Sequence, residues 1–442
     1  MDMTPKEIVA YLDNYVIGQR DAKKSIALAL RTRYRRMQLD PTIQDDIMPK
    51  NILMIGSTGV GKTEISRHLA KMMRVPFIKA EASKYTEVGF VGRDVESMIR
   101  DLVVASISIV KAEKEEENLE KIESYILNKI VEKLLSPLLA SSSEEEKVQR
   151  EKLEVEMQEK VSNKELDDTI IKIDIAKASI EFNDTNLPPE MVKIQESFTK
   201  MFSSLSKENN SMEISIKEAK ELLRQEASAK FLDMATIHIE ALRRAENGGI
   251  IFLDEIDKIA VNSKSEGRND PSKEGVQRDL LPIVEGSSVT TKYGVIKTDH
   301  ILFIAAGAFH LCKPSDLIPE LQGRFPLRVE LESLDEESLY KIMIQTKNSL
   351  LRQYTALLHV EGVELEFSEE AIRAIAKLAH KTNELTEDIG ARRLHTVLEK
   401  VLEEISFHAD EYKGQKYLVT PDLVHQKLDL VVEDQDLSRY IL

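Results

Sequence analysis

The sequence predicts a doubly wound α/β domain that is interrupted by a mainly helical insertion and followed by a smaller helix-rich domain. The short apolar segment 51–55 ends in a glycine-rich turn, and apolar residues then recur at helical spacing over 64–73. A glycine-free stretch rich in Glu and Lys occupies about 109–230. Apolar strands return at 249–253 and 300–304, before a helical pattern that begins near 332.

These changes in composition predict where the domains begin and end. We expect the α/β domain to comprise 1–108 and 231–331, with the insertion at 109–230 between its two parts. The small C-terminal domain is expected at 332–442. Within the insertion, the alternating segment 171–175 is a candidate strand, and the Ser-Glu tract 141–146 is expected to be a mobile connection.

The composition is that of a charge-rich globular protein of two or three domains. The chain has 442 residues, of which 42% are hydrophobic, enough for ordinary apolar cores. The formal net charge of −16 argues against binding to nucleic acid or to anionic membranes, because both need a basic surface. We expect the local basic stretch 31–36 to form a solvated or subunit-facing side of a helix.

The sequence also predicts a cytoplasmic location. Cys312 is the single cysteine, so no internal disulfide can form, which suits a reducing compartment. The N-terminal residues do not have the pattern of a signal peptide, and no apolar run reaches the ~18 residues that span a bilayer. The histidines and the cysteine show no zinc-site spacing, and no protease motif is found.

The turn after the first predicted strand carries the most specific motif in the chain. Residues 56–63 read GSTGVGKT and match G-x-x-x-x-G-K-[ST] in full. Glycines let such a loop wrap around phosphates with its N–H groups inward, and the helix that follows adds its positive end. Lys62 is expected to reach the β- and γ-phosphates of ATP, and Thr63 to offer its hydroxyl to Mg²⁺. The predicted ATP-binding residues of this segment are Gly56, Ser57, Thr58, Gly59, Val60, Gly61, Lys62, Thr63 and Glu64.

A pair of carboxylates follows the strand at 249–253. Asp254, at the strand end, suits a role in holding Mg²⁺ through its water shell. Glu255 suits the role of the catalytic base that orients or deprotonates the attacking water. An apolar run followed by Asp-Glu is common by itself, but together with the phosphate loop it predicts a nucleoside triphosphatase. We expect Asp257 to be a structural or solvated residue.

The order of these motifs is similar to that of AAA+ proteins of the Clp group, and the chain resembles the HslU (ClpY) family along nearly its whole length. That family supplies the ATPase of bacterial HslUV (ClpYQ) proteases. The resemblance implies an α/β P-loop NTPase (AAA+) fold, ATP and Mg²⁺ as cofactors, and a ring of subunits, expected to be a hexamer. It also implies that the chain unfolds proteins and passes them to a partner peptidase of HslV (ClpQ) type. The insertion matches the intermediate domain of the family.

Several further site residues are carried over from this resemblance. The segment 15–19 resembles the one that flanks adenine, with Val16 and Ile17 in contact with the base. Arg324 resembles the arginine finger that reaches the nucleotide of the adjacent subunit, and Glu320 matches a position beside that site. Arg392 resembles the second sensor, which contacts the γ-phosphate of its own subunit. For any single arginine, a solvated or ion-paired surface role is the alternative.

The resemblance also assigns two contact segments. The predicted pore loop that grips substrate is Gly89, Phe90, Val91 and Gly92, in which the family more often has Tyr at the aromatic position. The C-terminal residues predicted to dock into the peptidase are Leu437, Tyr440, Ile441 and Leu442. A buried Phe in a turn, and a tail folded onto its own domain, are the respective alternatives. Ala306 stands near the strand end where AAA+ proteins usually have a polar first sensor, so that role is in doubt.

Two other functions fit the same phosphate loop. A partner-independent chaperone or remodelling factor closer to the ClpX group would be expected to begin with a Cys-rich zinc site, which a single cysteine excludes. A DNA-working helicase or clamp loader is disfavoured by the acidic charge balance.

Overall fold

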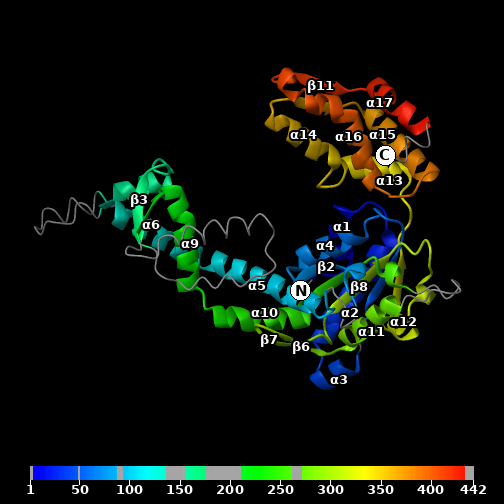
Figure 1. Cartoon of the computed structure of the whole chain (residues 1–442), viewed down its shortest axis with the longest axis horizontal. Helices are drawn as coiled ribbons and strands as arrows, with labels where there is room; N and C mark the ends of the chain where they lie inside the picture. Colours follow the sequence, from blue (N-terminus) through cyan, green and yellow to red (C-terminus); the bar gives the residue numbers. More distant parts are fainter. Residues whose placement is uncertain are drawn as a thin grey trace, which may run out of the picture. The chain divides into compact units, whose positions relative to one another are not determined.

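The computed structural model describes residues 3–47, 50–86, 93–135, 153, 155–174, 211–260 and 271–433. The chain forms two compact units, of which the first is Met1–Ile109 together with Glu240–Leu442 and the second is Val110–Ile239 (Figure 1). The second unit corresponds to the expected insertion, but it runs beyond 230 because α10 (Met234–Gly248) carries the chain from one unit into the other. The helices that the structure describes include none that is long and apolar enough to cross a membrane.

The first unit contains a five-stranded parallel sheet in the order β2-β5-β8-β1-β9. Its central strands are continuous apolar runs, which is what burial of both sheet faces requires. Along each strand, alternate side chains enter two separate cores, so that Met54 lies in one and Leu53 in the other. The strands are β1 (Ile52–Ile55), β2 (Phe77–Glu81), β5 (Ile250–Asp254), β8 (Leu302–Gly307) and β9 (Leu327–Glu330).

Register aligns the carboxyl ends of three neighbouring strands. Ile55 in β1 pairs with Gly307 in β8, and Leu253 in β5 pairs with Ala305 in β8. In parallel sheets of this kind, ligands bind outside the carboxyl ends of the strands. The helices and turns of this part of the unit are α1 (Pro5–Asp13), α2 (Arg20–Met37), α3 (Pro41–Asp46), α4 (Lys62–Met73), η1 (Ala82–Lys84), the first part of α5 (Ser97–Glu117), the end of α10, η3 (Ile256–Ile259), α11 (Pro271–Glu285), η4 (Pro314–Asp316) and α12 (Pro319–Arg324). The antiparallel pair β6 (Ser288–Thr291) and β7 (Gly294–Lys297) follows α11.

The C-terminal part of the same unit is rich in helix, as expected. Helix α15 shows why: Ser368 caps it by accepting the Ala371 N–H at 3.2 Å, and Ile372, Ile375 and Ala379 form a buried stripe at helical spacing. The elements are α13 (Glu336–Ile344), α14 (Leu350–Val360), β10 (Glu364–Phe367), α15 (Glu369–Leu385), α16 (Arg392–Phe407), η5 (Ala409–Tyr412), β11 (Lys416–Val419) and α17 (Pro421–Glu433). The sequence analysis did not predict the parallel pair formed by β10 and β11.

The second unit has a small aliphatic core of its own. Helices α6 (Leu119–Leu135) and α9 (Ile216–Phe231) pack with the antiparallel pair β3 (Ile170–Asp174) and β4 (Ser211–Ser215). The candidate strand at 171–175 is therefore observed, starting one residue earlier as β3. The Ser-Glu tract 141–146 lies outside the described residues.

The basic stretch 31–36 was expected to form a solvated or subunit-facing helix side; Arg35 is exposed, but Arg33 and Arg36 make contacts within the chain. Arg33 donates to the carbonyls of Asn247 (2.9 Å), Gly249 (3.1 Å) and His300, and burial lowers its pKa to about 10. Arg36 contacts the imidazole of His300 at 2.8 Å. These guanidinium groups pair with polar atoms between α10 and β5 and just before β8 begins. A run of basic residues here therefore stabilises the fold.

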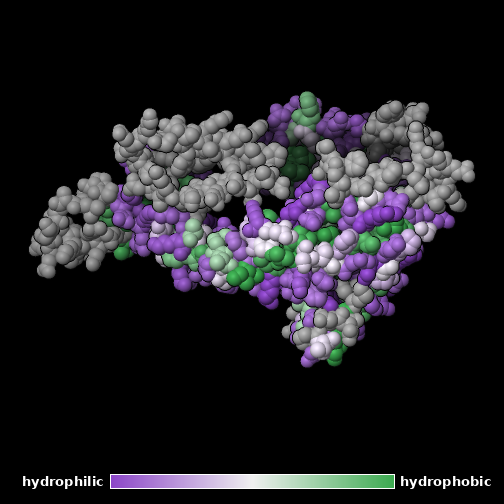
Figure 2. Space-filling model, turned by 60° about the horizontal axis from the view of Figure 1, so that its bottom comes forward, coloured by the Kyte–Doolittle hydropathy of each residue, from purple (hydrophilic) through white to green (hydrophobic). Residues whose placement is uncertain are grey.

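Hydrophilic residues cover much of the described surface in Figure 2, with apolar residues in smaller areas among them. The exposed apolar side chains include four from α2, α3 and the turn between them: Leu28, Met37, Leu39 and Ile43.

Candidate functional site

The phosphate loop lies at the carboxyl end of β1 and leads directly into α4. Gly61 caps α4 in the left-handed region (φ +106°), where a side chain would be strained, and the N–H groups of the first helical turn face the loop. Lys62 is buried, and its Nζ donates to the carbonyls of Gly56 and Ser57, the latter at 2.8 Å. Burial lowers the pKa of the Lys62 ammonium, and Asp254 acts in the opposite direction. The loop therefore holds one cation where the phosphates of a nucleotide are expected.

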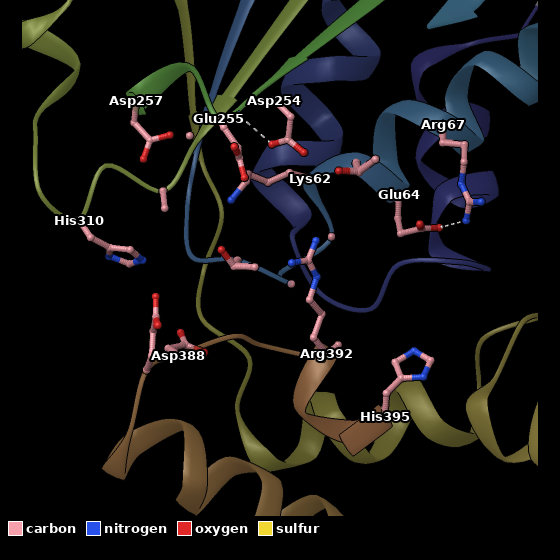
Figure 3. Close-up of a pocket in the computed structure, with 18 of the residues that line it drawn as sticks. Lys62, Glu64, Arg67, Asp254, Glu255, Asp257, His310, Asp388, Arg392 and His395 are labelled. Atoms are coloured by element: carbon pink, nitrogen blue, oxygen red, sulfur yellow. Dashed lines mark hydrogen bonds and ion pairs between the residues drawn. The ribbon is translucent and has the colours of Figure 1, made fainter. Parts of the chain in front are cut away.

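The two predicted catalytic carboxylates stand at the carboxyl end of β5, beside Lys62 (Figure 3). Asp254 contacts Lys79 of β2 through Oδ2 at 2.8 Å, and its Oδ1 accepts the Glu255 N–H at 3.0 Å. Glu255 adopts a left-handed backbone conformation (φ 56°), which is uncommon for a residue with a side chain. Its Oε2 contacts Lys258 at 2.9 Å and accepts from the Ser83 hydroxyl at 3.3 Å. Such local strain is typical of residues whose position matters for function.

Asp257 lines the cleft and orders a turn, whereas Ala306 lies in the core. Asp257 accepts the Phe309 N–H at 3.2 Å, and its carbonyl accepts from the Cys312 thiol at 3.4 Å, so it orders the turn after β8. Burial raises the pKa of that thiol to about 11. Ala306 is fully buried in the core beneath the sheet and does not line the cleft. The residues that follow it, Gly307 and Ala308, line the cleft instead.

The other end of the cleft is formed by the segment before α2 and by the second turn of α4. Val16 is buried against the phosphate loop, since a Cβ on Gly61 would lie 3.2 Å from its Cγ1. Ile17 is half-buried. Glu64 pairs with His68 (3.2 Å) and Arg67 (2.5 Å), and these hydrogen bonds lower its pKa to about 2.

The small C-terminal domain contributes to the same cleft. The N–H of Ala391 donates to the carbonyl of Gly59 at 3.2 Å, so the phosphate loop and the loop before α16 touch backbone to backbone. A Cβ on Gly59 would lie 2.0 Å from the Ile389 carbonyl oxygen, and a Cβ on Gly390 would lie 2.7 Å from the Gly59 carbonyl carbon. Both glycines are therefore required by this close approach. Arg392, the first residue of α16, points from there toward the loop (Figure 3).

Arg393 differs from its neighbour Arg392 in role. It is 4% exposed, and its guanidinium donates to Asn383 (3.2 Å), to the Thr386 hydroxyl (2.9 Å) and to the Glu387 carbonyl (2.9 Å). It therefore holds the loop between α15 and α16 in shape, whereas Arg392 is available to a ligand.

Arg324 and Glu320 are not part of this cleft. Arg324 ends α12, and its guanidinium pairs with Glu285 at 2.8 Å at the end of α11. Glu320 is exposed on α12. The side chain of Asn51 joins this region to the sheet, because it donates to the Arg324 carbonyl (3.1 Å) and accepts the Phe303 N–H (3.1 Å).

The cleft has a volume of about 1250 Å³. The predicted residues that line it are Thr58, Gly59, Gly61, Lys62, Thr63, Glu64, Asp254, Glu255 and Arg392. The remaining predicted residues within the described part of the chain do not line it: Gly56, Ser57, Val60, Val16, Ile17, Glu320 and Arg324. The predicted pore loop, 89–92, and the predicted docking tail, 437–442, lie outside the described residues.

Some lining residues were not predicted from the sequence. Arg67 and His68 line the cleft from α4, and Ile342 and Leu350 bring apolar surface from α13 and α14. Arg67 and His68 follow Glu64 at helical spacing, so the position of the phosphate loop could have indicated them. Ile342 and Leu350 carry no such signal, because only the tertiary fold brings α13 and α14 to the loop.

Comparison with known proteins identifies the family to which this chain belongs. The family model of the AAA domain (Cdc48 subfamily) matches residues 48–131 and 176–328, more than half of the chain. The chain is 62% identical over 442 residues to the ATP-dependent protease ATPase subunit HslU of Campylobacter jejuni subsp. jejuni serotype O:2, with 100% of both chains covered. It is 60% identical over 444 residues to the protein of that name from Helicobacter pylori strain G27, with 100% of this chain and 99% of the relative covered. The chain therefore belongs to the HslU family of AAA-type ATPase subunits of ATP-dependent proteases.

Proposed function

We propose that this chain is an ATP-driven unfoldase that forms a ring, expected to be a hexamer, and passes protein substrates into a separate peptidase of HslV type, which it activates. Family membership makes the chain the ATPase and not the peptidase. The observation that carries the proposal is one cleft that brings together the phosphate loop, the carboxylates Asp254 and Glu255, and Arg392 from the small domain.

The residues around the loop suit binding of ATP together with Mg²⁺. Thr63 supplies a hydroxyl and Asp254 a carboxylate, which are hard oxygen donors. The described residues hold no group of three or more His, Cys, Asp or Glu that could bind a metal by themselves, so these two fit an ion held mainly by phosphates and water. Mg²⁺ on the nucleotide would neutralise charge that develops on the phosphates. Lys62 would exchange its backbone carbonyl partners for phosphate oxygens.

Glu255 is placed to act on the attacking water. It lies one residue beyond Asp254 and lines the cleft, on a backbone that is held in the left-handed conformation. Its partners Lys258 and Ser83 orient the carboxylate without burying it. A carboxylate so held can accept a proton from water as the γ-phosphate is attacked.

Two arginines would connect hydrolysis to movement. Arg392 enters the cleft from the small domain, so its contact with the γ-phosphate would change when that phosphate leaves. Arg324 lies outside the cleft of its own chain, paired with Glu285, as expected of a finger that serves an adjacent subunit. Glu320, exposed beside it, would face the same interface.

The remaining assignments extend the family resemblance. Residues 89–92, with Phe90 at their centre, would grip substrate in the pore, and 437–442 would dock into the peptidase. The small domain, from about 332, would move the ring between its states. Unfolded or tagged proteins are the expected substrates. We place the assembly in the cytoplasm, where the single thiol of Cys312 stays reduced.

Cleavage of a small fluorogenic peptide by the matching peptidase tests this proposal, with and without the chain and ATP. We expect strong ATP-dependent activation that is lost when 437–442 are deleted, while ATP hydrolysis persists. Normal ATP hydrolysis without any activation would instead support a chaperone that acts without a peptidase.

A further inference from the structure

A fully buried amide connects the turn after Glu255 with the helix that carries Arg324. Gln277, in the second turn of α11, is 0% exposed. Its Nε2 donates to the Ile259 carbonyl at 2.7 Å, and its Oε1 accepts the Ile318 N–H at 2.8 Å. Both partners are backbone groups, one in the turn η3 and the other at the N-cap of α12. The proposed chemistry assigns no role to this residue.

The two partners fix the orientation of the amide. A carbonyl can only accept a hydrogen bond and a backbone N–H can only donate one, so Nε2 must face Ile259 and Oε1 must face Ile318. A side chain of this length that has both a donor and an acceptor is therefore required to bridge the two segments. Ile259 is itself buried, so water replaces a lost bond to its carbonyl poorly.

The first end of this bridge belongs to the cleft. Glu255 caps η3, and its carbonyl accepts the Lys258 N–H at 3.0 Å, so the proposed base and the turn form one hydrogen-bonded unit. Lys258 and Ala260, on either side of Ile259, line the cleft. A shift of Glu255 during hydrolysis would therefore move the carbonyl that Gln277 holds.

The second end belongs to a helix that lies beside α11 and outside the cleft (Figure 1). Ile318 is the N-cap of α12, a helix of 6 residues, so the position of its first turn sets the direction of the whole helix. The end of α11 contacts the other end of α12, where Glu285 pairs with Arg324. Glu320 and Arg324, which are proposed to serve the adjacent subunit, both lie on this helix.

We propose that Gln277 is a positioning residue that sets α12 against the turn after Glu255. The arginine offered to the adjacent subunit is thereby held in register with the hydrolysis site of its own chain. This rests on the proposed function, in which Arg324 completes the neighbouring site. Gln277 does not line the cleft, so it acts through the two backbone groups that it joins. A displacement of ~1 Å in a group that acts on the transition state can lower a rate by ~100-fold.

Two variants cut the bridge from opposite sides. Q277M keeps an unbranched side chain of similar length and removes both hydrogen bonds. I318P removes the N–H at the other end, and the φ of −59° at this residue and the extended residue before it already suit proline. I318P keeps the test valid if Q277M does not fold, which thermal denaturation will show. The matched control is V276A, because Val276 is a buried neighbour on α11 whose side chain only packs in the core.

Steady-state ATP hydrolysis by the full chain gives the first readout. Q277M and I318P are expected to lower kcat by ~10–100-fold with KM for ATP nearly unchanged, because the phosphate loop is untouched. V276A should lower the thermal stability and keep kcat within a few-fold of wild type.

Mixed rings distinguish positioning of the arginine from damage to the subunit's own site. E255Q subunits are expected not to hydrolyse ATP but keep an intact Arg324, which they can offer to a Q277M neighbour. Mixing the two should therefore raise the rate per Q277M subunit several-fold, toward the recovery given by R324A mixed with E255Q. Mixing Q277M with R324A should give no such recovery, since neither supplies a well-placed arginine.

A kcat of Q277M and I318P equal to that of V276A would overturn the inference. So would a low Q277M rate that does not recover beside E255Q while the R324A rate does, because the damage would then lie in the subunit's own site. If R324A hydrolyses ATP at the wild-type rate or does not recover beside E255Q, the proposed role of Arg324 fails and the inference falls with it, so the two failures are distinguishable.

Discussion

Replacement of Arg393 is predicted to lower the stability of the fold, whereas replacement of its neighbour Arg392 is predicted to lower ATP hydrolysis. Arg393 donates hydrogen bonds to Asn383, Thr386 and Glu387 from a side chain that is 4% exposed. The variant R393M keeps the aliphatic stem and removes these bonds, one of which is made to the buried side chain of Asn383. Hydrogen bonds to charged groups contribute about 1.5–3 kcal/mol each, and part of this is recovered by relaxation and water. We expect the free energy of unfolding to fall by about 3–5 kcal/mol.

The matched variant R392A removes a side chain that lines the cleft and leaves the bonds of Arg393 intact. Its free energy of unfolding should stay within about 0.5 kcal/mol of wild type, as for most surface substitutions. ATP hydrolysis should fall well below wild type at full nucleotide occupancy.

Urea unfolding of both variants, followed by circular dichroism, measures the first effect, and steady-state ATP hydrolysis measures the second. A stable R393M together with an unstable R392A would refute the assignment. So would an R392A variant that hydrolyses ATP at the wild-type rate.

Five further variants test other parts of the chain. Glu255→Gln should bind ATP normally and lose hydrolysis, and an unchanged rate would remove Glu255 from the role of base. Arg324→Ala should lower ring ATPase activity by ~10³-fold, as measured for other arginine fingers, whereas Glu285→Gln should leave it within a few-fold. The pKa of Glu64 is lowered to about 2, so its ion pairs stabilise the fold above the usual glutamate pKa and are lost as pH falls toward 2. The difference in thermal stability between wild type and Glu64→Gln should therefore shrink between about pH 5 and pH 3. Ala306→Ser buries a hydroxyl in the core, which should cost about 1–3 kcal/mol in urea unfolding without raising ATP hydrolysis.

Much of the α/β part could be predicted because its strands are continuous apolar runs. The runs that contain β1, β5 and β8 are each bounded by Gly, Asp or a turn, and the phosphate motif fixes which turn matters. The boundary of the insertion was harder to place, since α10 keeps its helical pattern across the change of unit. Short strands such as β10 and β11 escaped prediction because four residues give too little periodicity.

The basic stretch 31–36 shows a second limit. Arginines at helical spacing predict a solvated or subunit-facing helix side, because the sequence does not show which backbone carbonyls will lie beside them. In the fold, three carbonyls lie beside α2 and Arg33 donates to each of them; the Gly249 carbonyl also accepts the Leu302 N–H. The partner of a buried charge is a property of tertiary structure, so composition alone gives the wrong environment.

Gly59 illustrates how the structure explains a residue that the phosphate motif does not require. In the pattern G-x-x-x-x-G-K-[ST], this position accepts any residue. In this chain, the loop before α16 lies so close that a Cβ on Gly59 would collide with the Ile389 carbonyl oxygen. Gly390 faces Gly59 from the other side, and the Ala391 N–H donates to the Gly59 carbonyl. Because the phosphate loop and the base of α16 touch through backbone atoms, a shift of the loop on nucleotide binding must move the start of α16 or break this hydrogen bond. If the loop binds nucleotide as proposed, the small domain would therefore be coupled to it by this direct contact as well as through Arg392.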